Sequence, residues 1–299
     1  MRFSFWPTPS LAYADTLKLA QHAAATGWDG LWLADHFMPN AENTDVPWPE
    51  AWTTLAALAS RVERIRLGTL VTGNTYRHPA VLAKMAATID HISQGRLVLG
   101  LGSGWQENEH SQYGIEFGTF GERLAKLDEA CQLIKALFAE TQVSFDGKYY
   151  QLTDATLEPK PLQKPLPLLI GGGGEKVTLK ITAKYADEWN VWGEPPLLRH
   201  KMAILDDHCN NVGRDPADIQ RSAVALLFLT DDEQQLEQLR NRDIERPTII
   251  GNSEQVREII DEYASAGVNE LIVPDFTMGG MNQKIETMDK FIQEVVHGG

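Results

Sequence analysis

Short apolar runs alternate with longer amphipathic segments along the chain, and this alternation limits the folds open to it. Continuous apolar strands separated by helices are typical of a parallel sheet that is covered on both faces. The runs predict eight strands, at residues 3–6, 30–34, 65–72, 96–101, 166–170, 188–191, 224–229 and 270–273. Eight such units in 299 residues favour an α/β fold of the closed (β/α)8 TIM-barrel type over a doubly wound open sheet.

The amphipathic segments predict helices at about residues 10–26, 50–62, 79–92, 120–139, 176–185, 196–212, 233–240, 253–266 and 282–296. Ser10 is the expected N-cap of the first helix. Residues 143–152 interrupt the rhythm, because Asp146 and Gly147 lie between two aromatic-rich segments, as in a hairpin turn. We therefore expect a short β-hairpin inserted after the fourth long helix. No linker or repeat divides the chain, so residues 1–299 are expected to form a single domain.

The composition argues against several kinds of partner. The net charge is −14, whereas binding to nucleic acid or to an anionic membrane needs a basic surface. Cys131 and Cys209 lie far apart and form no CxxC pair, so neither a disulfide framework nor a zinc site is indicated. The N-terminal residues do not resemble a signal peptide, and no window approaches 18 apolar residues. We expect a cytoplasmic protein with a small-molecule substrate, no nucleic-acid partner and no membrane span.

Polar residues and glycines directly follow several predicted strands, where the sites of (β/α)8 barrels lie. They are Asp35 and His36 after the second strand, Gly104 and Asn108 after the fourth, and Gly171, Gly172, Gly173 and Gly174 after the fifth. A glycine run before a helix lets the backbone approach a ligand and present its N–H groups, which indicates a phosphate site. A flexible turn is the alternative for the glycines, and a structural role is the alternative for His36, whose imidazole could otherwise serve as an acid or base.

The histidines and carboxylates do not predict a metal site. Glu107 and His110 stand three residues apart, but no matching second pair is present and the HExxH motif is absent. A metal-dependent barrel hydrolase is therefore disfavoured. A cofactor-binding protein without catalysis stays open as an alternative to an enzyme.

Several stretches resemble the bacterial luciferase-like monooxygenase superfamily, and most closely its branch of coenzyme F420-dependent oxidoreductases. They are LWLADHF at residues 31–37, GTLVTGNTYRHPAVLAKMAATIDHISQGRLVLGLGSGWQENEHSQYGI at 68–115, FDGKYYQL at 145–152 and PLLIGGGGEK at 167–176. The resemblance implies a TIM barrel that binds a deazaflavin across the carboxyl ends of its strands and transfers a hydride to or from a small organic substrate. It also implies a homodimer.

The resemblance further implies roles for individual residues. Asp35 and His36 would lie beside the deazaflavin, with His36 as the acid, base or hydrogen-bonding group. A non-prolyl cis peptide at Leu70–Val71 would sit in a bulge against the ring, next to Thr72. The strand-four loop, with Gly104 and Asn108, would contact the cofactor, and Gly171 to Gly174 would hold its phosphate.

One position departs from the pattern of the resembling sugar-phosphate dehydrogenases, because Trp105 stands where they carry a glutamate. A sugar-phosphate substrate is therefore disfavoured, and the larger ring suggests an apolar or aromatic substrate. The nearest alternative keeps the fold and changes the cofactor. In that case the chain is an FMN-dependent two-component monooxygenase, which uses O2 and reduced FMN supplied by a separate flavin reductase.

Overall fold

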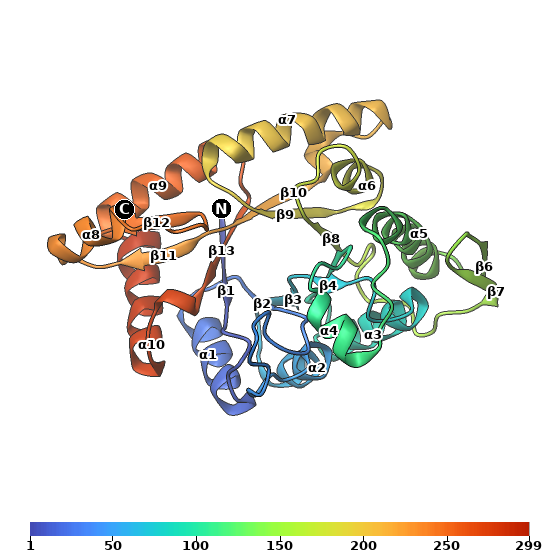
Figure 1. The fold of residues 1–299 in the computed structure, drawn as a ribbon, viewed down its shortest axis with the longest axis horizontal. Helices are drawn as coiled ribbons and strands as arrows, with labels where there is room; N and C mark the ends of the chain where they lie inside the picture. The colour runs from blue at the N-terminus through green and yellow to red at the C-terminus, as the bar shows by residue number, and fades with distance from the viewer. Residues whose placement is uncertain (299) are drawn as a thin grey trace.

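A ring of parallel strands lies at the centre of the computed structural model, which describes residues 1–298 (Figure 1). The ring consists of β1 (Arg2–Trp6), β2 (Gly30–Leu33), β3 (Arg66–Thr69) with β4 (Thr72–Gly73), β5 (Leu97–Gly102), β8 (Leu168–Gly171), β9 (Glu188–Trp192), β10 (Gln220–Val224) and β13 (Glu270–Pro274). Strand β3 pairs with both β2 and β5, which closes the sheet into a barrel. The predicted (β/α)8 barrel is confirmed.

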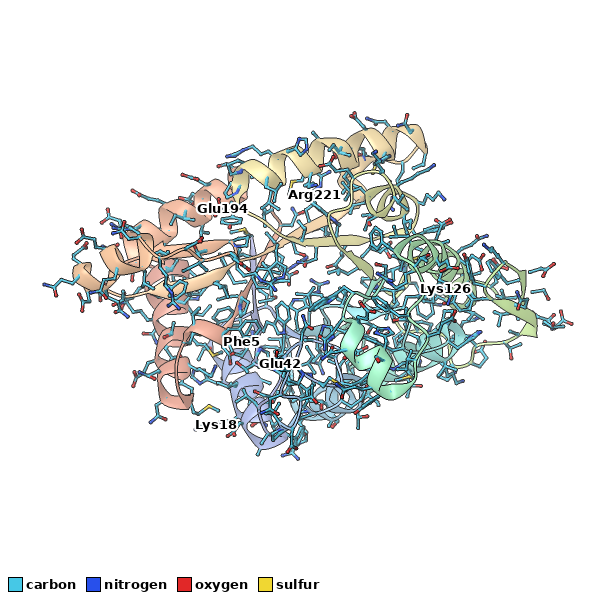
Figure 2. All side chains as sticks on the ribbon, in the orientation of Figure 1. Phe5, Lys18, Glu42, Lys126, Glu194 and Arg221 are labelled. Carbon is cyan, nitrogen blue, oxygen red and sulfur yellow. The ribbon has the colours of Figure 1, made fainter. Side chains whose placement is uncertain are left out.

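Helices surround this ring. They are α1 (Tyr13–Thr26), α2 (Ala51–Arg61), α3 (Pro79–Ile92), α5 (Phe120–Ala139), α6 (Thr178–Tyr185), α7 (Pro195–Asn211), α9 (Ser253–Ser265) and α10 (Met281–Lys290), which continues into a π-helical turn at Phe291–Val296. Two further helices, α4 (Glu107–Tyr113) and α8 (Glu233–Arg240), and two 3-10 turns, Pro216–Asp218 and Asp275–Thr277, lie in the connections. Figure 2 shows Lys18 and Lys126 on the outer helices and Phe5 among the strands.

Two apolar clusters hold these layers together. The larger one lies between the sheet and the helices, where residues such as Leu31 and Leu67 are almost fully buried. The smaller one fills the inside of the barrel and contains Trp6, Trp32, Leu70, Val98, Leu169, Val224 and Ile272. The barrel interior is thus a packed core, as is usual for eight strands, and a ligand must bind above it rather than through it.

Charged residues close the amino-terminal end of the barrel. The buried carboxylate of Glu270 accepts hydrogen bonds from Ser4 Oγ at 2.6 Å, Trp32 Nε1 at 2.9 Å and Arg66 Nη1 at 2.9 Å. Arg66 also pairs with the carboxylate of Glu188. These buried charges satisfy one another, which leaves the carboxyl ends of the strands for a site.

The strand predicted at residues 224–229 was placed wrongly. The barrel strand is β10, which ends at Val224, whereas β11 (Leu226–Leu229) leaves the barrel and pairs in parallel with β12 (Thr248–Gly251). The apolar pattern does not mark β10, because the strand begins with polar residues. One of them, Ser222, is buried and accepts a hydrogen bond from Asn190 rather than facing solvent. The apolar run then continues into β11 without a break in the pattern, and β12 was not predicted.

Smaller corrections concern the ends of two helices, and the predicted hairpin is confirmed. Helix α1 begins at Tyr13 rather than at Ser10, and α6 begins at Thr178 rather than at residue 176. The hairpin is present after α5 as β6 (Val143–Asp146) and β7 (Gln151–Ala155), at the edge of the molecule (Figure 1).

The third predicted strand is interrupted by a bulge. Its halves β3 and β4 both pair with β5, but the five residues from Gly68 to Thr72 lie opposite the four from Val98 to Leu101. The extra length contains the peptide bond between Leu70 and Val71, which is cis as expected.

Candidate active site

A cavity of about 1300 Å³ opens at the carboxyl ends of the barrel strands. Six of the predicted site residues line it, namely His36, Leu70, Val71, Gly104, Gly171 and Gly172. They come from the ends of β2, β3, β5 and β8, which are far apart in sequence. The predicted convergence of these strand ends on one cleft is therefore observed.

The other five predicted residues, Asp35, Thr72, Asn108, Gly173 and Gly174, are not among those that line the cavity. Asn108 Nδ2 donates to the carbonyl oxygen of Pro39 at 2.9 Å, and Thr72 Oγ1 accepts a hydrogen bond from Trp52 Nε1 at 2.8 Å. These side chains therefore support the loops and helices that surround the cavity.

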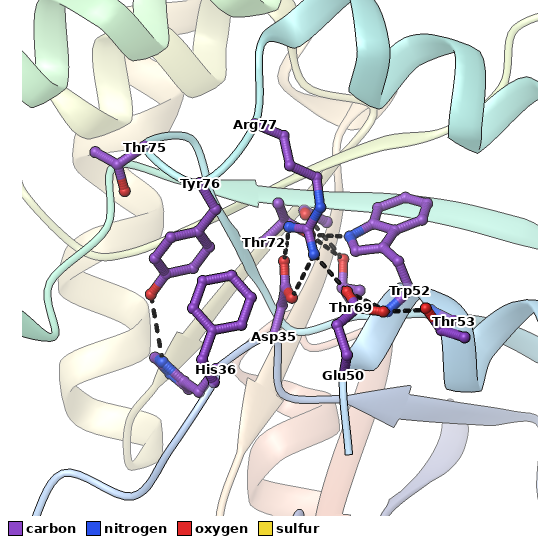
Figure 3. A network of polar contacts seen from close by, with 12 residues as sticks. Asp35, His36, Glu50, Trp52, Thr53, Thr69, Thr72, Thr75, Tyr76 and Arg77 are labelled. Carbon is purple, nitrogen blue, oxygen red and sulfur yellow. Dashed lines mark hydrogen bonds and ion pairs between the residues drawn. The ribbon is translucent and has the colours of Figure 1, made fainter. Parts of the chain in front are cut away.

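Asp35 belongs to a buried ion-pair network behind the cavity wall (Figure 3). Its carboxylate is fully buried and accepts two hydrogen bonds from Arg77, at 2.6 and 3.1 Å. Arg77 also pairs with Glu50 at 2.5 Å, and Glu50 caps α2 by accepting from the backbone N–H groups of Trp52 and Thr53. Burial raises the pKa of Asp35, while the Arg77 guanidinium acts in the opposite direction. The network fastens the end of β2 to α2 and to the loop before α3.

His36 points the other way, and its Nδ1 lies 2.8 Å from Oε1 of Glu109. The same carboxylate accepts the Phe37 backbone N–H at 2.7 Å and a hydrogen bond from the Tyr76 hydroxyl. Burial acts to raise the pKa of Glu109, but the hydrogen bonds from His36 and Tyr76 outweigh it and lower that pKa. Burial, reinforced by the hydrogen bond to Glu109, raises the pKa of Tyr76. Glu109 is thus an ionised acceptor that holds the end of β2.

The bulge at Leu70–Val71 forms part of the cavity wall and depends on neighbouring glycines. A Cβ atom added at Gly171 would lie 2.9 Å from Val71 Cγ1, and one added at Gly102 would lie 2.8 Å from Val71 Cγ2. Such contacts are too short for carbon atoms. The side chain of Val71 therefore occupies space that these two glycines leave open.

The glycine loop after β8 offers free backbone donors. Gly172 has φ of +122° and donates its N–H to Asn190. Within residues 1–298, the N–H groups of Gly173 and Gly174 donate to no protein acceptor. A Cβ added at Gly173 would lie 3.8 Å from Cε of Lys201, whose ammonium group pairs with Glu175 at 2.6 Å. The glycines do not directly precede α6, because a turn at residues 175–177 separates them from it.

Aromatic side chains form much of the remaining wall. Trp6 packs against Trp192 and Phe276, with ring centroids 5.9 and 5.5 Å apart. Trp105, 58% exposed, forms a T-shaped pair with the His36 ring, with ring centroids 5.4 Å apart. Arg246, from a cavity-lining loop at residues 242–246, lies over the Trp192 ring at 4.7 Å.

The sequence does not predict Tyr76, Arg77 or the 242–246 loop as parts of this region. It leaves Glu109 open between a polar ligand contact and the first turn of a short helix, and the structure places it in the first turn of α4. Their partners lie between 27 and 73 residues away, so no local motif marks them. No group of three or more His, Cys, Asp or Glu residues within 1–298 is placed to hold a metal ion. In the same part of the chain, no helix has the length and apolar character needed to cross a membrane.

The fold and the cavity define a (β/α)8 barrel with a bulged third strand and a polar and aromatic cleft at its carboxyl end. The chain belongs to the luciferase-like monooxygenase family, whose model matches residues 1–246.

Relatives and structures agree with this assignment. The chain is 40% identical over 174 residues to an F420-dependent glucose-6-phosphate dehydrogenase of Amycolatopsis mediterranei (strain U-32), covering 58% of this chain and half the length of that relative. It superimposes with a TM-score of 0.84 on the coenzyme F420-dependent tetrahydromethanopterin reductase of Methanopyrus kandleri, at 20% identity and 99% coverage of both chains. The oxygenating constituent of 3,6-diketocamphane monooxygenase of Pseudomonas putida, in complex with FMN, gives 0.76 at 15% identity, covering 99% of this chain and 98% of that one.

Proposed function

We propose that this chain is an oxidoreductase that transfers a hydride between coenzyme F420 and a small organic substrate in the cavity at the carboxyl ends of the strands. One observation carries the proposal. The cavity brings together His36, the Val71 bulge and Gly171 and Gly172, and the glycine loop continues from there into two residues, Gly173 and Gly174, with unused backbone donors. The names of the F420-dependent relatives support the choice of cofactor. We propose that the whole chain acts as one domain.

The residues present fit a cofactor of this kind. Val71 would lie against its ring, and the free N–H groups of Gly173 and Gly174 would bind its phosphate, with Lys201 as the adjacent cation. When bound, F420 accepts or donates the hydride. The chain supplies position, electrostatics and a route for the proton.

His36 is the group we assign to that proton. A substrate that gives up a hydride from a C–H bond also gives up a proton from its O–H or N–H group. The Nδ1 atom of His36 is bonded to Glu109, whereas its Nε2 has no hydrogen-bond partner within residues 1–298. Nε2 would accept the substrate proton in oxidation and return it in reduction, so both atoms and charge balance.

FMN is the second candidate cofactor, because the FMN-bound monooxygenase shares the fold. A flavin reductase would then be the partner, and O2 a co-substrate. We also propose a homodimer in the cytoplasm, which sedimentation and cell fractionation would test.

The first experiment is calorimetric titration of the purified protein with F420 and with FMN, each oxidised and reduced. Preference for F420 supports the proposal, preference for reduced FMN transfers it to the monooxygenase class, and binding of neither overturns both. Two glycine variants test whether the cofactor binds in this cavity, one as the test and the other as its control. Gly172→Ala strains a residue in the cavity and should weaken binding, whereas Gly213→Ala strains a residue with φ of +71° and open space around it and should not.

A second experiment tests the role of His36. His36→Ala should lower turnover by about 10²–10⁴-fold while F420 affinity is retained, if the imidazole moves the proton. Unchanged turnover would reject that role.

A further inference from the structure

We infer that Glu109 is a positioning residue that fixes the imidazole of His36 in a single tautomer, with the proton on Nδ1 and the lone pair of Nε2 available to the cavity. The functional meaning of this arrangement rests on the proposed function. The arrangement itself follows from hydrogen-bond geometry.

Three donors share the carboxylate of Glu109. Glu109 lies on α4, and its side chain is fully buried against the end of β2. Its Oε2 accepts the Phe37 N–H at 2.7 Å, and its Oε1 receives both His36 Nδ1 at 2.8 Å and the hydroxyl of Tyr76. An ionised carboxylate can only accept hydrogen bonds, so Nδ1 must carry a proton.

No other charged group competes with Glu109 for the imidazole of His36. Asp35, the preceding residue, is engaged by Arg77, which is itself shared with Glu50. Trp105 forms a T-shaped pair with the imidazole and carries no charge. Tyr76 Oη lies 3.5 Å from Nδ1 (Figure 3), but its own proton goes to Glu109. Glu109 alone therefore decides the tautomer.

An amide in place of the Glu109 carboxylate would reverse the hydrogen bond to His36. In Glu109→Gln we expect the amide oxygen to stay opposite the Phe37 N–H, because that partly buried donor needs an acceptor. The amide NH2 group then faces Nδ1 of His36 and must donate to it. A change of one atom is thus expected to reverse the tautomer, so that Nδ1 becomes the acceptor and Nε2 carries the proton.

The test is a long-range 1H–15N correlation spectrum of the histidine side chains of the cofactor-free protein, with His36 assigned from His36→Asn. The spectra are followed upward in pH until the ring is neutral. We expect a protonated Nδ1 and a bare Nε2 in the wild type, and the reverse in Glu109→Gln. A bare Nδ1 in the wild type, or the same tautomer in both proteins, would overturn the inference.

Two matched variants separate positioning from a general effect on the fold. Glu107→Gln changes the exposed carboxylate two residues earlier on α4 and should leave the His36 signals unchanged. Tyr76→Phe removes the competing hydroxyl and should retain the Nδ1–H tautomer, since Glu109 remains. Loss of that tautomer in Tyr76→Phe would assign the tautomer to Tyr76 and refute the role of Glu109. If Glu109→Gln does not fold, Tyr76→Phe and the wild type still decide the assignment.

Turnover then distinguishes this inference from the proposed function. With the tautomer reversed, kcat with F420 should fall by about 10²–10⁴-fold while F420 affinity is unchanged. If the spectra show reversal but turnover is unaffected, the positioning by Glu109 stands and the proposed role of His36 fails. If F420 does not bind, the proposed function fails while the spectra still judge Glu109.

Discussion

Replacing Arg77 by alanine would leave a buried charge without a counter-ion. The Asp35 carboxylate is fully buried and receives two hydrogen bonds from Arg77, whose side chain is 13% exposed. Removing one partner of a buried pair costs roughly 3–5 kcal/mol, because the remaining charge is uncompensated. Glu50 should not add to this cost, since it is 36% exposed and keeps its backbone donors. We therefore expect Arg77→Ala to lose roughly 3–5 kcal/mol of unfolding free energy at neutral pH.

Urea unfolding of three variants tests this reasoning. Arg61→Ala removes an exposed arginine at the end of α2 and should change the unfolding free energy by no more than about 0.5 kcal/mol. Arg77→Ala combined with Asp35→Asn should recover part of the loss, because the amide carries no charge. Equal costs for Arg77→Ala and Arg61→Ala, or no recovery in the double variant, would refute the argument.

The pH dependence of Arg77→Ala gives a second check on the same charge. Burial raises the pKa of Asp35, and the opposing effect of Arg77 is absent in the variant. A carboxyl whose pKa is higher in the folded state destabilises the fold most above that pKa. The cost of the substitution should therefore shrink as the pH falls toward the ordinary value of 3.8.

Three further predictions concern packing, exposure and acid stability. Gly100→Ala should lower the unfolding free energy measured in urea by at least about 1–3 kcal/mol, because its Cβ would overlap the carbonyl oxygen of Thr69. Gly121→Ala in α5 places its Cβ in open space and should raise the unfolding free energy by about 0.5–1 kcal/mol. Trp105→Phe should remove much of the tryptophan emission that acrylamide quenches and change stability by no more than about 0.5 kcal/mol, since Trp105 is 58% exposed; unchanged quenching would contradict its placement. The pKa of Glu109 is lowered, so its ionised form stabilises the fold at neutral pH. This contribution is lost as the pH falls from 4.5 through the pKa of Glu109 in the folded state. The difference in unfolding free energy between wild type and Glu109→Gln should therefore narrow over that range, and a constant difference would contradict the prediction.

Most of the barrel was predictable because its strands are buried on both faces and therefore read as apolar runs. The exception shows where this signal ends. Ser222 of β10 is buried but polar, since it bonds to Asn190 across the strands, and the pattern assigned the strand to the apolar residues that follow. Only pairing with β9 and β13 places the barrel strand correctly.

The cavity wall was predictable where a residue directly follows a barrel strand. His36 and Gly172 follow strands directly, so the barrel topology alone brings them to the cavity. The partner of His36 was not predictable in this way, because Glu109 lies 73 residues further along and reaches His36 only through the packing of α4 against the end of β2. Asn108, its neighbour, is turned to Pro39 by the same helix.

Because β11 leaves the barrel, two walls of the cavity are supported by different sheets. The wall with His36, Val71 and Gly171 belongs to strand ends whose hydrogen bonds also close the barrel. The facing wall, from Leu226 through the 242–246 loop, belongs to a separate two-stranded sheet that takes no part in that closure. Insertions or replacements between β11 and β12 can therefore reshape the entrance while the wall with His36, Val71 and Gly171 keeps its support. Diversification of substrate range in this scaffold is expected to concentrate in that segment.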